Sequence, residues 1–409
     1  MFVGIKEKIA RNNTQKPFSK SKFFFANTIY GFCNCSFIML LLTPFLRTKI
    51  DDPLKLSTIM SVNAITSFAF MYISGFMVDR IGARITFVIG KITDLIAICL
   101  LFSNNLNVLM LAVLIKGISE GITYDGKYNA YIYNYLAMYD KLKYYAKFSA
   151  GYYFMFDIAC FLYSFISAII LKTNTYQVLI VMSIVVKTLG VISALILIPS
   201  KSVFKQNDFL SKSVKESWQI FKDCVRKNNV FVYIIFFYAF IQTCSYSFSY
   251  FVGDLMLLDI GLHQAEVAQY TSSIFMFATI GALIPIFFFK NDLKIRKIII
   301  CCFIQLFVVL IAILVYKPLF LRIAMLLSIL TLPLFEISIE RKIEFYSNRK
   351  IRGVVISISM SMMILMTALE NLIVGSIAKL ASYQMSGCCM MLLYLIMLSF
   401  LFKKLKTID

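Results

Sequence analysis

Histidine is almost missing from this sequence, which has a single one, His263, among 409 residues. Ten cysteines are present, but none stands at a spacing to histidine that would hold zinc. We interpret them as small, mostly buried apolar residues. A Gly-x-x-x-x-Gly-Lys-Ser/Thr loop is also absent from the sequence, which argues against ATP hydrolysis. We therefore expect no metal, no cofactor and no enzymatic activity.

Acidic residues and long polar stretches are scarce as well. The 21 Asp and Glu compare with 41 Lys and Arg, and 60% of the residues are hydrophobic. Soluble domains have about 45–50% apolar residues. Apolar windows of about 20 residues, each able to cross a bilayer, recur along the whole chain. They lie near residues 23–46, 55–77, 85–103, 106–128, 146–171, 175–198, 229–252, 267–289, 297–316, 318–339, 354–378 and 384–402. We predict an all-α integral membrane protein with about twelve transmembrane helices.

The basic residues are distributed unevenly over the predicted loops. With the N-terminus inside, 30 of the 41 Lys and Arg adjoin inside segments and 7 adjoin outside segments. This asymmetry follows the positive-inside rule and predicts a multi-pass protein of the cytoplasmic membrane with both termini in the cytoplasm. The positive charge then faces anionic head groups, so membrane lipids are the expected partners and nucleic acid is not.

The longest polar interruption divides the chain near its middle. It spans residues 199–228, where apolar residues recur at helical spacing at Leu210, Val214, Trp218, Phe221 and Val225. This spacing predicts an amphipathic helix on the membrane surface, with a disordered linker as the alternative. We predict six-helix bundles at residues 1–198 and 229–409, joined by this linker. Because one chain holds both bundles, we expect a monomer.

A charged turn stands between the second and third apolar windows. It reads Gly75-Phe-Met-Val-Asp79-Arg80-Ile-Gly82-Ala-Arg84, and Ile85 follows where a further basic residue would complete the motif. The turn resembles the signature of the major facilitator superfamily, in the loop after the second helix. Asp125-Gly-Lys-Tyr-Asn-Ala-Tyr-Ile-Tyr-Asn-Tyr-Leu136 and Arg352-Gly-Val-Val-Ile-Ser357 resemble further patterns of a bacterial, twelve-helix branch. An ordinary basic loop is the alternative reading of the turn.

The resemblance implies two parallel bundles and roles for the signature residues. Gly75 would let the second helix approach a neighbour, and Gly82 would permit the tight return into the third. Asp79 would face the start of the eleventh helix, near Arg352, and so close the inner gate. Arg80 and Arg84 would hold Asp79 and anchor the turn at the head groups.

Ionisable residues inside the predicted helices are functional candidates because a charge in the membrane is costly. Lys116 and Glu120 share a face of the fourth helix, either as a solute or proton site or as a self-satisfied structural pair. Asp157 is the candidate proton carrier, with a salt bridge as the alternative. Other candidates for solute or proton contact are Asn27, Asn34 and Glu336. We expect a buried structural charge network from Lys91, Asp94 and Lys187. Glu370 falls in the eleventh helix.

These features favour a secondary active transporter that moves a small organic solute by alternating access. A proton is the expected coupling ion. The direction is open, with export of drug-like solutes slightly favoured and uptake of an anionic metabolite as the alternative. A non-transporting membrane sensor or a membrane enzyme is the alternative from another class.

Overall fold

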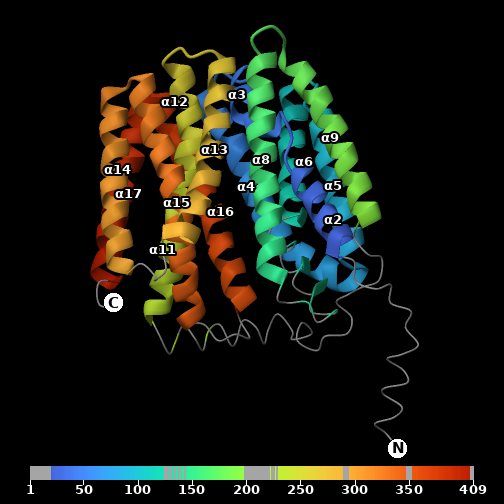
Figure 1. The fold of residues 1–409 in the computed structure, drawn as a ribbon. Coiled ribbons are helices and arrows are strands. Elements are labelled where there is room, and N and C mark those ends of the chain that lie inside the picture. The colour runs from blue at the N-terminus through green and yellow to red at the C-terminus, as the bar shows by residue number, and fades with distance from the viewer. Residues whose placement is uncertain are drawn as a thin grey trace, which may run out of the picture.

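The computed structural model describes residues 20–123, 144–197, 229–288, 294–346 and 352–405, together with single positions between 128 and 141 and at 222 and 226. Every regular element in these ranges is helical (Figure 1). The first bundle consists of α2 (Lys20–Phe32), η1 (Met39–Leu41), α3 (Leu42–Arg47), α4 (Pro53–Ile81), α5 (Ala83–Leu100), α6 (Leu106–Thr123), α8 (Tyr145–Ile170) and α9 (Tyr176–Leu197). The second consists of α11 (Asn229–Ser247), η3 (Phe248–Val252), α12 (Gly253–Asp259), α13 (Gln264–Phe288), α14 (Ile295–Val315), α15 (Pro318–Tyr346), α16 (Arg352–Leu380) and α17 (Tyr383–Leu405).

Helices occupy all twelve apolar windows, which confirms the predicted all-α fold class. Eight spans among the described residues are long and apolar enough to cross a membrane by themselves. Helix α5 is not among them, since it carries Arg84, Lys91 and Asp94. The predicted amphipathic helix of the linker lies almost entirely outside the described residues.

Two predicted helices have different limits in the structure. The first, expected to be continuous over 23–46, is interrupted between Phe32 and Met39. The seventh was expected to end at residue 252 but continues through the π-helical η3 into α12 and ends at Asp259. Asp254, which lies just beyond the predicted end, is buried within the longer span.

Local chemistry explains several helix ends. The Asp52 carboxylate accepts the backbone N–H of Leu54 at 2.9 Å and so caps α4, whose first residue is Pro53. Gly82 separates α4 from α5 with a backbone φ of 89°, a conformation that glycine adopts without a Cβ clash. A single residue therefore separates the two helices at the position where the resemblance implies a tight return.

Glycine lets α6 pack closely against α4 in the first bundle. A Cβ added at Gly117 would lie 2.5 Å from the Asn63 carbonyl oxygen, and one at Gly121 would lie 2.5 Å from the Ser67 carbonyl oxygen. In a membrane there is no hydrophobic driving force for helix association, and small residues at such positions allow the close van der Waals packing that holds helices together. This close packing sets the position of the polar side chains on α6.

The two bundles meet along α4 with α16 and along α8 with α13. Where α4 meets α16, the Ser61 hydroxyl donates to the Ala368 carbonyl at 2.9 Å. A Cβ at Gly375 would overlap Ser57, at 2.3 Å from its Cβ. The Lys379 ammonium lies 3.3 Å from the Asp52 carboxylate. These contacts hold the two bundles together along α4 and α16.

Candidate functional site

The interruption of the first helix is the centre of a polar network in the first bundle. Residues 33–38 leave the helical path, and this frees backbone groups that a continuous helix would bond internally. The Asn34 carbonyl accepts a hydrogen bond from the Lys187 ammonium at 2.6 Å. The Ile38 N–H donates to the Ser183 hydroxyl at 3.0 Å. Both partners come from α9, so side chains of the sixth span satisfy the broken backbone of the first.

Lys187 also forms a buried ion pair with Asp94 of α5. Its Nζ lies 2.8 Å from Asp94 Oδ2, and the two side chains are only 2% and 10% exposed. Isolated charges at such depth would be very unfavourable, so each ion depends on its partner. The pair ties α5 to α9, while the second hydrogen bond of Lys187 ties both to the break at Asn34.

A second buried lysine reaches the same asparagine. The Lys91 ammonium donates to Asn34 Oδ1 and lies 4.6 Å from the centre of the Tyr30 ring. The Asn34 amide in turn donates to the Tyr152 hydroxyl at 2.9 Å. The carbonyl, side-chain oxygen and amide of this one residue therefore bond to three different helices, α9, α5 and α8.

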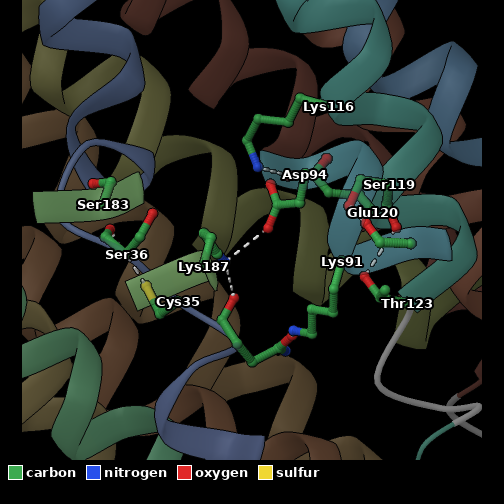
Figure 2. A network of polar contacts seen from close by, with 12 residues as sticks. Cys35, Ser36, Lys91, Asp94, Lys116, Ser119, Glu120, Thr123, Ser183 and Lys187 are labelled. Atoms are coloured by element: carbon green, nitrogen blue, oxygen red, sulfur yellow. Dashed lines mark hydrogen bonds and ion pairs between the residues drawn. The ribbon is translucent and has the colours of Figure 1, made fainter. Parts of the chain in front are cut away.

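Asp94 lies between two ammonium groups (Figure 2), those of Lys187 and Lys116. Lys187, Lys116 and Lys91 all act electrostatically on its carboxylate. The predicted charge network of Lys91, Asp94 and Lys187 is thus gathered in one place, and Lys116 extends it to α6. Its structural or functional role stays a prediction.

Lys116 and Glu120 form an ion pair one turn apart on α6. Asn63 of α4 donates to the second carboxylate oxygen of Glu120 at 2.9 Å. The two members of the pair differ in accessibility, since the Lys116 side chain is 11% exposed and that of Glu120 is 41% exposed. Glu120 is therefore the accessible end of a chain of charges that is otherwise covered.

Three further predicted site residues lie on other helices. Asp157 is half-buried on α8. Asn27 is buried on α2 and donates to the Phe148 carbonyl at 2.6 Å. Glu336 lies on α15 in the second bundle, where it accepts a hydrogen bond from Gln242 at 2.8 Å. The predicted contacts of these three residues with solute or protons stay predictions.

The signature turn is described only in part. Gly82 has the backbone conformation given above, and Arg84 is half-buried at the start of α5. Asp79 and Arg80 belong to the last turn of α4, and Arg352 begins α16. Their side chains and the surroundings of Gly75 lie outside the described part, so the predicted inner gate stays a prediction.

Two buried carboxyl groups of the second bundle had no predicted role. Asp254 on α12 and Glu370 on α16 are both 2% exposed. Asp254 was missed because the predicted helix ended before it, although an acidic residue inside an apolar run was a usable signal. In the described ranges no group of three or more His, Cys, Asp or Glu side chains could hold a metal ion.

Comparisons with known proteins place these features in a family. Residues 23–335 match the family model described as the Major Facilitator Superfamily. A comparison with curated protein sequences found no significant match.

Solved structures share the fold at low sequence identity. A mutant of the nucleoside transporter NupG is similar with a TM-score of 0.73 and 14% identity, covering 94% of this chain and 99% of that one. A bacterial homologue of the human lysosomal transporter Spinster, in an inward-facing conformation, has a TM-score of 0.71 and 13% identity over 95% and 98% of the two chains. A D-xylose–proton symporter has a TM-score of 0.66 and 13% identity over 91% and 95%.

Proposed function

Because the chain belongs to the Major Facilitator Superfamily, we propose that it is a secondary active transporter that moves a small organic solute by alternating access. The structural neighbours named for nucleoside and for xylose–proton transport support this class of activity over a membrane enzyme or sensor. We place both termini in the cytoplasm from the distribution of basic residues. On this orientation, the contacts of Asp52 with Lys379 and of Ser61 with Ala368 close the outer side.

The observation that carries the proposal is the unequal exposure of the Lys116–Glu120 pair. An ionised side chain inside a membrane-spanning helix marks a pathway for a solute or ion. Glu120 is 41% exposed, whereas Lys116 is 11% exposed and is paired with it. The accessible group is therefore a carboxylate, which attracts a proton, a cationic group or a hydrogen-bond donor.

This geometry favours neutral or cationic solutes over the anionic metabolite considered from the sequence. An anion would need the ammonium of Lys116, but Glu120 and Asp94 already neutralise it. Lipophilic cations fit the carboxylate and are typical cargo for drug-like export. We propose export in exchange for protons, with Glu120 alternating between its salt bridge and the proton or solute.

The test is transport by the purified protein in proteoliposomes with an imposed pH gradient. A panel of neutral, cationic and anionic solutes would be compared for the native protein, Glu120→Gln and the control Glu266→Gln. Glu266 is an exposed carboxylate at the start of α13, so its removal should leave transport intact. We expect proton-driven movement of a neutral or cationic solute that Glu120→Gln slows at least about tenfold, equivalent to about 1.4 kcal/mol.

Two outcomes would contradict the proposal. Glu120→Gln could transport as well as the native protein, in which case this carboxylate has no part in the cycle. Alternatively, only anions could move, with Lys116→Ala abolishing their transport. That result would establish the anionic-metabolite alternative instead.

A further inference from the structure

Glu370 is a buried carboxyl group in the second bundle that the proposed solute site does not use. It lies on α16, 2% exposed, at the junction with α11 and α17. Both of its carboxyl oxygens are covered, and neither makes a hydrogen bond of standard geometry. Hydroxyl groups from the two neighbouring helices face it, Ser247 from α11 and Tyr394 from α17. The carboxyl therefore occupies a small polar site enclosed by three helices.

Glu370 differs from Asp94 in the charges that surround it. Among the described residues, the titratable groups that act on Glu370 are the Cys244 thiol of α11 and the Tyr394 phenol of α17, both neutral in an apolar junction. In the part of the chain that the structure describes, no lysine or arginine acts on this carboxyl. Asp94, in contrast, has three lysines around it. An isolated carboxylate in a dry interior is so unfavourable that the group takes up a proton instead.

The opposite side of α16 forms the contact between the bundles. The Ala368 carbonyl accepts from Ser61 at 2.9 Å, and Gly375 packs against Ser57, both on α4. Residues 368 and 375 flank Glu370 on the same helix. Water that reached Glu370 would have to separate α16 from α11 or α17. Such a movement shifts the helix that seals the bundles together, so the protonation of Glu370 and the contact with α4 are coupled.

A local irregularity of α11 lies beside this junction. Its regular helix ends at Ser247, and the π-helical η3 follows over Phe248–Val252. Single π-turns within helices are rare and occur frequently at functional sites. Ser247, one of the two hydroxyls that face Glu370, is thus the last residue before the point where the path of the helix changes.

We propose that Glu370 is a proton-binding site of the second bundle, loaded while α16 is packed against α4 and discharged when α16 withdraws. Loading transfers a proton from a hydronium ion to a carboxylate oxygen, and discharge returns it to water. As a step of the transport cycle, this inference rests on the proposed function. The binding of a proton by Glu370 can be measured without any solute.

The first experiment is infrared spectroscopy of the full-length protein in lipid at neutral pH. A protonated carboxyl has a carbonyl band that an ionised carboxylate lacks. We expect Glu370→Gln to remove the intensity of one such group, while the control Glu266→Gln leaves the band unchanged. Tyr394→Phe should shift the frequency of the band without removing it, because it alters the hydroxyl that faces the carboxyl.

Two infrared results would overturn the proposal. One is an identical band in the native protein and Glu370→Gln, which would show that Glu370 is ionised at neutral pH. The other is loss of the band on adding sodium ions, which would make the site a cation site rather than a proton site. Tyr394→Phe gives an independent test if Glu370→Gln fails to fold.

The coupling to α16 is tested by hydrogen–deuterium exchange. Because glutamine mimics the protonated carboxyl, Glu370→Gln should slow exchange in residues 53–61 and 368–380 relative to the native protein at alkaline pH. Equal exchange would refute the coupling. If the protein carries out proton-driven transport but the infrared band of Glu370 is absent, the proton site is refuted and the proposed function stands. If the band is present but no solute is transported, the proposed function is refuted and the proton site stands.

Discussion

Replacing Asp94 by asparagine tests the charge network most directly. The substitution keeps the shape of the side chain but removes the negative charge next to the ammonium groups of Lys187, Lys116 and Lys91. Glu120 would then be the carboxylate of this network that remains to balance the charge of the three lysines. Breaking a buried ion pair by removing one partner costs about 3–5 kcal/mol. We expect Asp94→Asn to lie at the upper end of this range, because it leaves several cations unbalanced.

Removing the partner lysine should cost less. In Lys187→Met, Asp94 keeps the ammonium groups of Lys116 and Lys91 near it. The main loss is then the charged hydrogen bond to the Asn34 carbonyl, which would remain without a donor. An unsatisfied buried polar group costs about 1–3 kcal/mol. The double variant should be more stable than the sum of the two single losses implies, since it removes cation and anion together.

The assay is unfolding in mixed detergent micelles, followed by helical circular dichroism, for the native protein, the two single variants and the double variant. Sites that do not interact give additive losses to within about 0.3–0.5 kcal/mol. Equal losses in the single variants, or additive losses in the double variant, would refute the view that Asp94 balances several lysines.

Three further predictions concern the contacts between helices. Partial desolvation alone would raise the pKa of Asp52, but hydrogen bonds from the α4 backbone and the Lys379 ammonium outweigh it and hold the pKa below its ordinary value. The contribution of this contact is therefore present above about pH 4 and lost as the pH falls through the folded-state pKa. Distances between labels on α4 and α16 should widen at acidic pH in the native protein and be insensitive to pH in Asp52→Asn. Gly117→Leu should destabilise the protein by at least about 1–3 kcal/mol in thermal unfolding because its side chain would overlap the backbone of α4, whereas Gly151→Ala, which faces only a phenylalanine ring, should be tolerated. Asp79→Asn should favour the inward-open state, so unchanged accessibility of engineered cysteines from the cytoplasmic side would contradict the role of the signature turn.

The sequence predicted the elements whose signals are local. Apolar windows located the helices, and the glycine of the signature turn stands where the backbone has a positive φ. The intramembrane charges were recognisable because each is an isolated ionised residue in an apolar run. Their mutual positions depend on the packing of α5, α6 and α9, which residue spacing within one helix does not encode.

The interruption at Asn34 had no such local signal. The residues around it are as apolar as a continuous span, and the group that matters is a backbone carbonyl, which every residue has. Its partner, Lys187, lies 153 residues away in the sequence. The sequence also could not show which groups surround Glu370, because that depends on how α11, α16 and α17 pack together; among the residues described here, none of these groups is a lysine or arginine.

The broken first helix also constrains how the protein is made. The backbone at residues 33–38 depends in part on side chains far along the chain, because the Asn34 carbonyl accepts from Lys187 and the Ile38 N–H donates to Ser183. Those partners, Lys187 and Ser183, belong to α9, the last helix of the first bundle to be synthesised. We therefore expect these two backbone groups to gain their final partners only after the sixth span has been inserted.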